Sequence, residues 1–370
     1  MTTPMQDLLA HDPTDVRRRE GMALCLSGGG YRAMVFHAGV LQRLNELGYL
    51  KKLDFVSSVS GGSITAGILA LAWKELDFDD QGRAVDFDKR VLEPVRDMAT
   101  RGIDVMSVLT GLLLPGQRIS DRVQAAYREH LFGNATLQNL PDHPRFVFCA
   151  TNLQTTSLFR FSKRYVADHR LGIARERDVP LATAVAASSA FPPYLSPVTL
   201  RLPADAWDPE IPQTLAEGVR DPITLTDGGV YDNLGIEPVI KRCSGLLVSN
   251  GGGQVGHPGR IPTDWLRHLQ RVTGVVDNQV RSLRKRMLVE GYRRGEFTGA
   301  YWSIRSAVAD FELPDPLPFS DARARELADV PTRLAGLGDV TEDLLRWGYV
   351  ICDTAMRRWV VDREKVPQVT

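Results

Sequence analysis

The chain has 370 residues, of which 43% are hydrophobic and 24% are charged, and its formal net charge is zero. This composition is typical of a globular protein with a large core, built as one large domain or two. The balanced charge gives no general electrostatic reason to expect binding to nucleic acid.

Its four cysteines are scattered without a Cys-x-x-Cys pair, which argues against a zinc site or a disulfide framework and favours a reducing compartment. Residues 1–20 are polar and lack the apolar core of a signal peptide, and no run of 18 apolar residues occurs. We therefore expect a cytoplasmic protein, with peripheral association as its route to a membrane.

Residues 22–27 form an apolar run that predicts a buried strand, and three glycines at 28–30 follow it directly. A helix is predicted from 34 to 47. A glycine-rich loop between a strand and a helix presents backbone N–H groups to an anion. The loop lacks the spacing of either common nucleotide-binding motif, so a single oxyanion is the better ligand.

Two charged or titratable residues follow this loop. Arg32 either adds a positive charge to the anion site or supports the loop, and the sequence leaves both roles open. His37 lies on the predicted helix and is expected to pack in the core.

Residues 55–59 predict a second short strand, which Gly61 and Gly62 end before an apolar run with helical spacing. Ser60 stands at the turn. This arrangement predicts a nucleophile elbow, where a serine hydroxyl leaves the sheet above a helix N-terminus that favours negative charge. The usual Gly-x-Ser-x-Gly has Ser58 in place of its first glycine, and the turn alone is equally compatible with a structural role.

The succession of strand, loop, helix, strand, elbow and helix predicts a three-layer α/β/α fold with a mostly parallel central sheet. Residues 103–114 are strongly apolar but too short to span a bilayer, and form either a core helix or a lid. Residues 145–152 and 156–162 are predicted to form a hairpin, and 181–190 an alanine-rich helix.

A strand at 223–227 delivers Asp227 to Gly228 and Gly229. An Asp-Gly turn often closes a hairpin, but residues 234–240 predict a helix instead of a returning strand. This is therefore the second place where glycines hold a polar side chain at the end of a strand.

The rest of the chain predicts strands at 245–249 and 301–305 and helices at 263–295, 321–335 and 340–359. The basic residues of the first of these helices are either solvated or face anionic lipid.

A serine hydroxyl becomes an effective nucleophile when a base takes its proton. In a Ser-Asp-His triad the histidine would be His257 or His268, which lie in a predicted loop and inside a predicted helix. In a dyad, Asp227 takes the proton itself, and desolvation would make it a stronger base. Two polar side chains held by glycines at strand ends favour a Ser60–Asp227 dyad.

Three separated motifs, taken in order, resemble the patatin-like phospholipase family. They are Ser27-Gly28-Gly29-Gly30-Tyr31-Arg32-Ala33, the Ser60 elbow and Asp227-Gly228-Gly229. The first also looks like the loop of cytosolic phospholipases with this fold, and the resemblance covers roughly residues 22–250. It implies that Ser60 is acylated and that Asp227 is the base. It also implies an oxyanion hole at Gly28, Gly29 and Gly30, joined by Gly61, with Arg32, Gly62, Gly228 and Gly229 as supporting residues.

The expected activity is that of a serine lipid acyl hydrolase, of the phospholipase A or lysophospholipase type, acting on a lipid at a membrane surface. No metal, cofactor or nucleic acid is expected, and the sequence leaves a protein partner open. The alternatives are an esterase for soluble or neutral-lipid esters and a lipid-binding module whose site has decayed. We expect a polar segment at 1–20, a catalytic domain at 21–260 and a helical part at 261–370 packed on the same domain.

Overall fold

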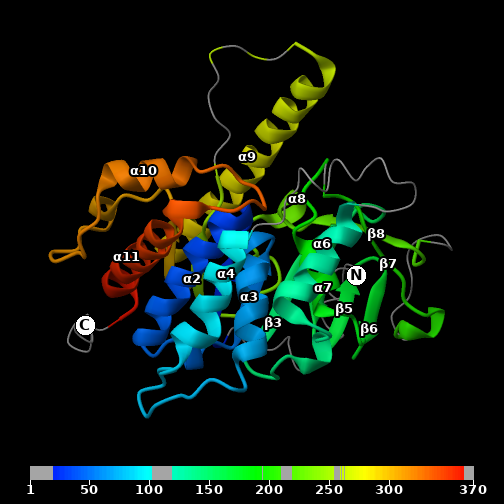
Figure 1. The fold of residues 1–370 in the computed structure, drawn as a ribbon, viewed down its shortest axis with the longest axis horizontal. Helices are drawn as coiled ribbons and strands as arrows, with labels where there is room; N and C mark the ends of the chain where they lie inside the picture. Colours follow the sequence, from blue (N-terminus) through cyan, green and yellow to red (C-terminus); the bar gives the residue numbers. More distant parts are fainter. Residues whose placement is uncertain are drawn as a thin grey trace.

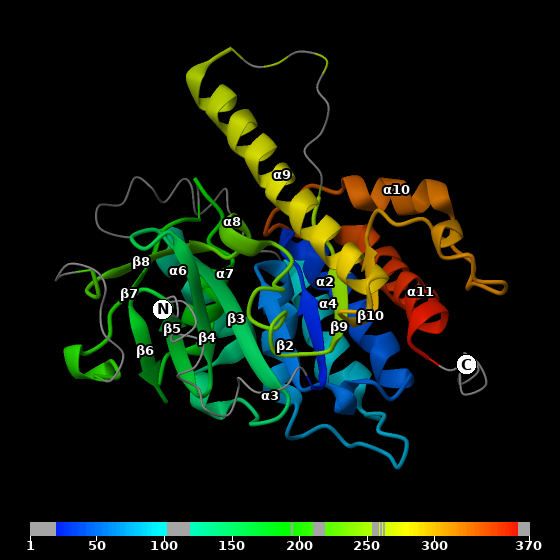
Figure 2. The ribbon, with the colours of Figure 1, turned by 180° about the vertical axis from the view of Figure 1, so that it is seen from behind.

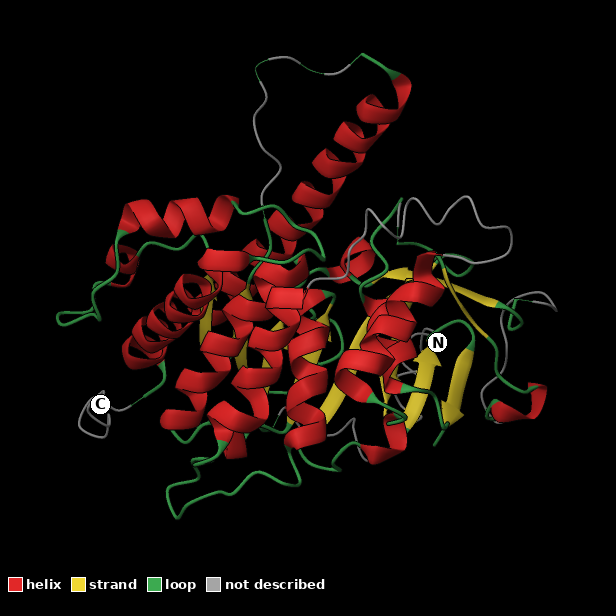
Figure 3. Ribbon diagram, in the orientation of Figure 1, coloured by secondary structure: helices red, strands yellow, loops and turns green. Residues whose placement is uncertain are grey.

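The computed structural model describes residues 20–101, 119–193, 195–209, 219–253, 259, 261 and 263–361. The apolar stretch at 103–114 lies outside these residues. The chain folds into three layers, with a twisted sheet between helices on its two faces (Figures 1 and 3). The predicted α/β/α class is therefore confirmed.

The strands are β1 (Met22–Leu26), β2 (Phe55–Val59), β3 (Arg145–Asn152), β4 (Ser157–Ser162), β5 (Tyr165–Asp168), β6 (Gly172–Arg175), β7 (Val198–Leu200), β8 (Ile223–Asp227), β9 (Gly245–Asn250) and β10 (Thr298–Ser303). The helices are α2 (Gly30–Glu46), α3 (Gly61–Ala72), α4 (Glu93–Arg101), α6 (Ile119–Tyr127), α7 (Leu181–Ser188), α8 (Gly229–Asp232), α9 (Trp265–Arg293), α10 (Asp321–Asp329) and α11 (Thr341–Trp359).

The sheet has a parallel centre and an antiparallel flank. Its order is β10-β9-β1-β2-β3-β4-β5-β6, and every neighbouring pair from β10 to β3 is parallel. Beyond β3 the strands are antiparallel, and β8 also pairs with β3 in the antiparallel sense. The ends of β1, β2 and β9 therefore lie at one edge, as is usual for ligand sites in such sheets.

Successive side chains of the central strands pack alternately in two separate cores, one on each face of the sheet. Leu24 and Leu26 of β1 belong to the core under α2, α3, α4 and α11, whereas Ala23 and Cys25 belong to the core on the opposite face. That second core includes Leu288 of α9, a helix on the face of the sheet that is turned toward the viewer in Figure 2. Because both faces of β1 are covered, its sequence is continuously apolar.

Helices α2 and α11 approach each other unusually closely through two glycines. A methyl group placed on Gly39 would lie 1.9 Å from the carbonyl oxygen of Leu345, and one on Gly348 would lie 2.0 Å from that of Phe36. A buried ion pair at 2.7 Å joins Arg43 of α2 to Asp353 of α11. The C-terminal helix is thus locked onto the helix that begins at the glycine-rich loop.

Helix α9 projects from the body at its N-terminal end, while its C-terminal end packs on the sheet beside β10 (Figures 1 and 2). Arg281 and Arg284 of this helix, and Arg294 directly after it, form ion pairs within the protein. None of the helices in the described part of the chain combines the length and apolar composition needed to cross a membrane.

Two predicted helices differ from the structure. The helix expected at 234–240 is a series of turns, and the short helix α8 lies earlier, at Gly229–Asp232. Pro238 has no N–H to donate, so a continuous helix does not extend through this apolar run. The helix expected at 321–335 ends at Asp329.

Candidate active site

Ser60 occupies a sharp turn between β2 and α3. Its backbone has φ 52° and ψ −122°, a conformation that L-residues rarely adopt and that clusters at functional sites. Its N–H donates to Oγ of Ser188 at 3.0 Å. The turn is therefore held from outside the elbow, by a residue at the end of α7.

Strand register brings Ser60 and Asp227 together. Val59, the last residue of β2, pairs with Cys149 of β3, and Asp227, the last residue of β8, pairs with the next residue, Ala150. Strand β4 pairs with one edge of β3. Strands β2 and β8 therefore both pair with the other edge of β3, one after the other along its length. The two strands meet end to end, with Ser60 directly after the last residue of β2 and Asp227 as the last residue of β8.

The Asp227 carboxylate is buried and only partly hydrogen-bonded. Its Oδ1 accepts the N–H of Gly229 at 2.7 Å, whereas Oδ2 has no hydrogen-bond partner among the described residues. Burial raises the pKa of Asp227 to about 6, and the Gly229 N–H, the Ser60 hydroxyl and the Arg281 charge oppose that rise.

The Ser60 hydroxyl is thus close enough to influence the Asp227 pKa, but the contact does not meet the distance and angle of a formed hydrogen bond. Such loose contacts are common between catalytic groups before a substrate tightens them.

The glycine-rich loop offers two free donors instead of three. The N–H of Gly28 donates to the main-chain oxygen of Asn233 at 3.1 Å, so the expectation that Gly28 supplies a donor needs correction. The N–H groups of Gly29 and Gly30 have no acceptor within the described chain. The N–H of Gly61, at the start of α3, likewise has no acceptor among the described residues. Three neutral backbone donors are therefore available to an oxyanion.

The supporting glycines permit close approach between the motifs. A methyl group on Gly61 would lie 2.0 Å from the oxygen of Gly30, and one on Gly62 would lie 2.5 Å from the oxygen of Leu26. At the other strand end, a methyl group on Gly228 would lie 2.2 Å from the oxygen of Cys149. Side chains at these positions would push the glycine loop, the elbow and the Asp227 turn apart.

Arg32 is buried, and its guanidinium is bonded to parts of the chain other than Ser60 and Asp227, as a supporting residue would be. Its guanidinium donates to the main-chain oxygens of Gly251, Ala328 and Val330 and to the Thr332 hydroxyl. Burial lowers its pKa to about 10, so it stays charged at neutral pH. These bonds tie the start of α2 to the segment after α10.

The histidines do not complete a triad in the described structure. His268 is exposed on α9, and His257 lies outside the described residues. His37 is buried, with ring nitrogens 2.9 Å from Oγ of Ser249 and 3.0 Å from the oxygen of Ser27, so its predicted packing role is confirmed. Burial lowers the pKa of His37 to about 4, which keeps the ring neutral.

Three residues at the site were not identified from the sequence. Ser188 accepts the Ser60 N–H and donates to the oxygen of Cys149 at 2.7 Å. Asn233 holds Gly28, and Arg281 brings a positive charge near Asp227. Ser188 and Asn233 stand in stretches that also resemble the patatin-like phospholipase family, but the sequence assigns no role to either side chain. The position of Arg281 near the site depends on the folded structure.

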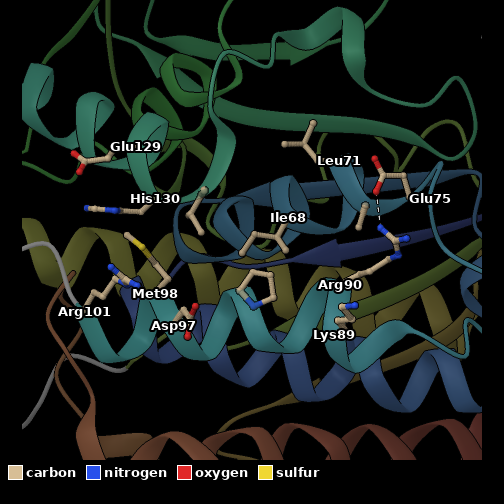
Figure 4. Close-up of a pocket in the computed structure, with 13 residues that line it drawn as sticks. Ile68, Leu71, Glu75, Lys89, Arg90, Asp97, Met98, Arg101, Glu129 and His130 are labelled. Atoms are coloured by element: carbon tan, nitrogen blue, oxygen red, sulfur yellow. Dashed lines mark hydrogen bonds and ion pairs between the residues drawn. The ribbon is translucent and has the colours of Figure 1, made fainter.

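A cavity of about 680 Å³ lies elsewhere, beyond the C-terminal end of α3 (Figure 4). Ile68 and Met98 face it, with Arg101 and His130 at one end and Arg90 paired to Glu75 at the other. Neither Ser60 nor Asp227 lines it. Within the described residues, no group of three or more histidine, cysteine or carboxylate side chains is placed to hold a metal ion.

Comparison with known proteins links this geometry to a family. The family model described as patatin-like phospholipase matches residues 24–240, more than half of the chain. No curated protein sequence matches.

Two solved structures resemble the fold. Human GIVD cytosolic phospholipase A2 has 13% identity and a TM-score of 0.49, over 95% of this chain and 61% of that one. VipD from Legionella pneumophila has 16% identity and a TM-score of 0.36, over 92% of this chain and 67% of that one. The chain thus spans about three fifths of the length of the human enzyme.

Proposed function

Because the chain belongs to the patatin-like phospholipase family, we propose that it is a serine lipid acyl hydrolase that uses Ser60 as nucleophile and Asp227 as general base. Its substrates are carboxylic esters of membrane lipids, in a reaction of the phospholipase A or lysophospholipase type. The protein works at a membrane surface, to which it associates peripherally from the cytoplasm.

The end-to-end meeting of β2 and β8 is the observation that carries this proposal. It sets the elbow serine beside a buried carboxylate whose Oδ2 has no partner within the described chain. Burial raises the pKa of Asp227 to about 6, which makes it a stronger base than an exposed aspartate while leaving it ionised at neutral pH.

In the acylation half of the reaction, Oδ2 of Asp227 takes the proton from Oγ of Ser60 as Oγ attacks the ester carbonyl carbon. The carbonyl oxygen becomes an oxyanion, which accepts hydrogen bonds from the N–H groups of Gly29, Gly30 and Gly61. The positive end of α3 adds to this stabilisation. Collapse of the tetrahedral intermediate breaks the bond to the alcohol, which leaves with the proton held by Asp227.

In the second half, Asp227 takes a proton from water as the water oxygen attacks the acyl-enzyme. The same three N–H groups hold the second oxyanion. Collapse releases the fatty acid and returns the proton to Ser60. The dyad therefore needs no histidine in either half of the reaction.

The proposal is tested by measuring ester hydrolysis by the wild type and by Ser60→Ala, Asp227→Asn, His257→Ala and His268→Ala. We expect activity to be lost in the first two variants and kept in the two histidine variants. Activity that persists in Ser60→Ala would exclude the mechanism, and loss in a single histidine variant would point to a triad.

Two further assays separate the alternatives. A fluorophosphonate probe should label Ser60 in the wild type, and absence of labelling would favour a decayed binding module. Phospholipid vesicles should be hydrolysed faster than soluble p-nitrophenyl esters of the same acyl chain, whereas the reverse order would favour a soluble esterase.

A further inference from the structure

Helix α9 carries an exposed apolar stripe along most of its length. Its members recur at intervals of three, four or seven residues, so they lie on one face of the helix. Trp265, at the N-terminal end, is 78% exposed. Contiguous apolar patches on a protein surface commonly mark a site of interaction. This α9 stripe consists of Trp265, Leu269, Val272, Val276, Leu283 and Met287, all of them exposed.

The opposite face of α9 is the one that packs on the rest of the protein. Leu288 is buried in the second core, and the Tyr292 hydroxyl donates to the main-chain oxygen of Leu246 in β9 at 2.7 Å. At about 100° per residue, Leu288 and Tyr292 lie on the side of the helix away from Leu283. The α9 stripe therefore faces away from the body of the molecule.

The N-terminal half of α9 projects on the side of the molecule where the dyad lies. Nη1 of Arg281 donates to the oxygen of Gly253, just beyond the end of β9, at 2.7 Å. The charge of Arg281 also lowers the pKa of Asp227, so the helix passes close to the dyad at this point. Residues 265–280 continue past this edge of the sheet, by about 24 Å at the rise of an α-helix (Figure 1).

The charge of α9 complements an anionic surface. Its seven arginines and lysines and two acidic residues give it a net charge of +5, although the whole chain is neutral. Arg267, Lys285 and Arg286 are exposed, and helical spacing places the first two on the side away from the α9 stripe. Tryptophan, leucine and valine on one face with arginine and lysine on the other are typical of helices that lie in the interface of an anionic membrane.

A second copy of the chain is the other occupant that a stripe with this spacing fits. Pairing two copies would bring together two helices that each carry a net charge of +5, and such charges repel at close range. An anionic bilayer supplies the opposite charge as well as an apolar layer for the exposed side chains.

We propose that the α9 stripe is the surface by which the protein docks on an anionic lipid bilayer. Trp265, Leu269, Val272 and Val276 enter the boundary between head groups and acyl chains, and the arginines and lysines of the helix contact the anionic head groups. Docking in this way brings the edge of the sheet that carries Ser60 toward the lipid. The inference rests on the proposed lipid hydrolase function for its purpose, and it names the element that holds the enzyme at the membrane.

Co-sedimentation with vesicles of ether-linked phospholipids tests the docking surface without relying on turnover, because these lipids carry no carboxylic ester. Vesicles of dialkyl phosphatidylcholine are compared with and without dialkyl phosphatidylglycerol. The wild type should bind the anionic vesicles about tenfold or more tightly than the neutral ones, and added salt should reduce the difference. The double variant Trp265→Ser, Leu269→Ser should bind the anionic vesicles about tenfold or more weakly than the wild type.

Trp359→Ser is the matched control, because it removes an exposed tryptophan from the end of α11 and should bind like the wild type. Trp265 and Leu269 are exposed, so the double variant should keep its fold, which circular dichroism checks. If the wild type does not bind anionic vesicles, or if the double variant binds them as tightly as the wild type does, the proposal is overturned.

Two further measurements distinguish insertion from other uses of the stripe. Tryptophan emission of the wild type should shift to shorter wavelength on adding anionic vesicles, and Trp265→Phe should lose most of that shift. An equal shift in both proteins would overturn insertion of α9. Sedimentation equilibrium should show a monomeric wild type, whereas a dimer that the double variant converts to a monomer would assign the stripe to a second copy of the chain.

The docking surface and the hydrolase can fail separately. A wild type that binds anionic vesicles through the α9 stripe, yet neither hydrolyses esters nor reacts with a fluorophosphonate, would reject the hydrolase and retain the docking surface. A wild type that hydrolyses lipid esters, with vesicle binding that the double variant leaves unchanged, would reject the docking surface and retain the hydrolase.

Discussion

The N–H of Gly229 donates to Oδ1 of Asp227 across 2.7 Å, two residues further along the same turn. One carboxylate oxygen is thereby fixed, and the other stays available beside Ser60. An ordinary aspartate rotates freely about its terminal bond, whereas this one has a single orientation.

The Asp227→Asn variant keeps this orientation and removes the base. The amide oxygen still accepts from Gly229, so the fold should be retained, while kcat for ester hydrolysis should fall by about a thousandfold. Steady-state kinetics measures the loss, and circular dichroism checks that the fold is unchanged. Near wild-type turnover in this variant would rule out Asp227 as the base.

Activity should depend on pH through the same carboxylate. Because burial raises the pKa of Asp227 to about 6, the base becomes protonated as the pH falls through that value. The value of kcat/KM should therefore be level near pH 7 and fall about tenfold per pH unit below about 6. A profile that stays level down to pH 4.5 would mean that another group takes the proton.

The free energy of unfolding should depend on pH through Asp227 in the opposite sense to the activity. The folded pKa of Asp227, about 6, lies above the ordinary aspartate value of 3.8, so burial favours the protonated carboxyl. Its contribution to folding is fully present below about pH 4 and is lost as the pH rises through 6. Asparagine mimics the protonated form, so Asp227→Asn should gain stability relative to the wild type between pH 4 and pH 7.5, by about 3 kcal/mol at most. Urea unfolding at the two pH values measures the difference, and an equal effect at both would contradict it.

The elbow conformation should be detectable as stored strain. Ser60 has φ 52°, which glycine adopts without penalty and alanine does not. Both Ser60→Gly and Ser60→Ala should be inactive, but the glycine variant should be more stable than the alanine variant by roughly 1 kcal/mol. Denaturant unfolding of the pair tests this, and a more stable alanine variant would indicate that the turn is relaxed.

Ser188 should influence the rate without touching the substrate. Its hydroxyl holds the Ser60 N–H at 3.0 Å, so Ser188→Ala leaves that N–H unsatisfied and loosens the elbow. We expect kcat to fall about tenfold or more with little change in KM. Ser189→Ala is the matched control, because the Ser189 hydroxyl bonds to the Tyr127 hydroxyl and the Val185 oxygen instead of to the Ser60 N–H. Equal losses in both variants would indicate general damage to α7.

The glycine loop should be sensitive to added volume as well as to φ. Gly30 has φ 62°, and a methyl group there would lie 2.6 Å from the oxygen of Arg333. Gly133 has φ 52° with nothing within 4 Å of such a methyl group. Gly133→Ala should cost about 1 kcal/mol of stability and no activity, whereas Gly30→Ala should cost more and lower kcat. Similar effects in both variants would show that Arg333 moves aside without consequence.

The three motifs were predictable because each is a local signal. A short apolar strand followed by glycines identifies the loop, the elbow and the Asp227 turn from neighbouring residues alone. Strand assignments at 145–152 and 223–227 agree with β3 and β8 for the same reason. The spacing of apolar residues does not indicate which edge of β3 pairs with β8. The arrangement of β2 and β8 end to end along β3 is therefore seen only in the structure.

The contacts that orient these motifs could not be predicted in the same way. Ser188 lies 128 residues from Ser60 along the chain, and Arg281 lies on a helix whose other basic residues look equivalent to it in sequence. The helix expected at 234–240 illustrates a related failure. Its apolar residues have helical spacing, but in the structure they lie in turns, and Leu234, Ile236 and Val239 pack in the core on the α9 side of the sheet.

The pairing of β1 with β9 and the packing of α11 on α2 have a consequence for where the protein can be divided. The family match ends at 240, but β1 is paired on one side by β9, which is paired in turn by β10. A fragment that stops at 240 would leave β1 as a bare apolar edge, of the kind that recruits other chains into aggregates. Fragments for expression or crystallisation should therefore extend through α11, which packs on α2 and ends at Trp359, and fragments that stop at 240 are expected to form inclusion bodies.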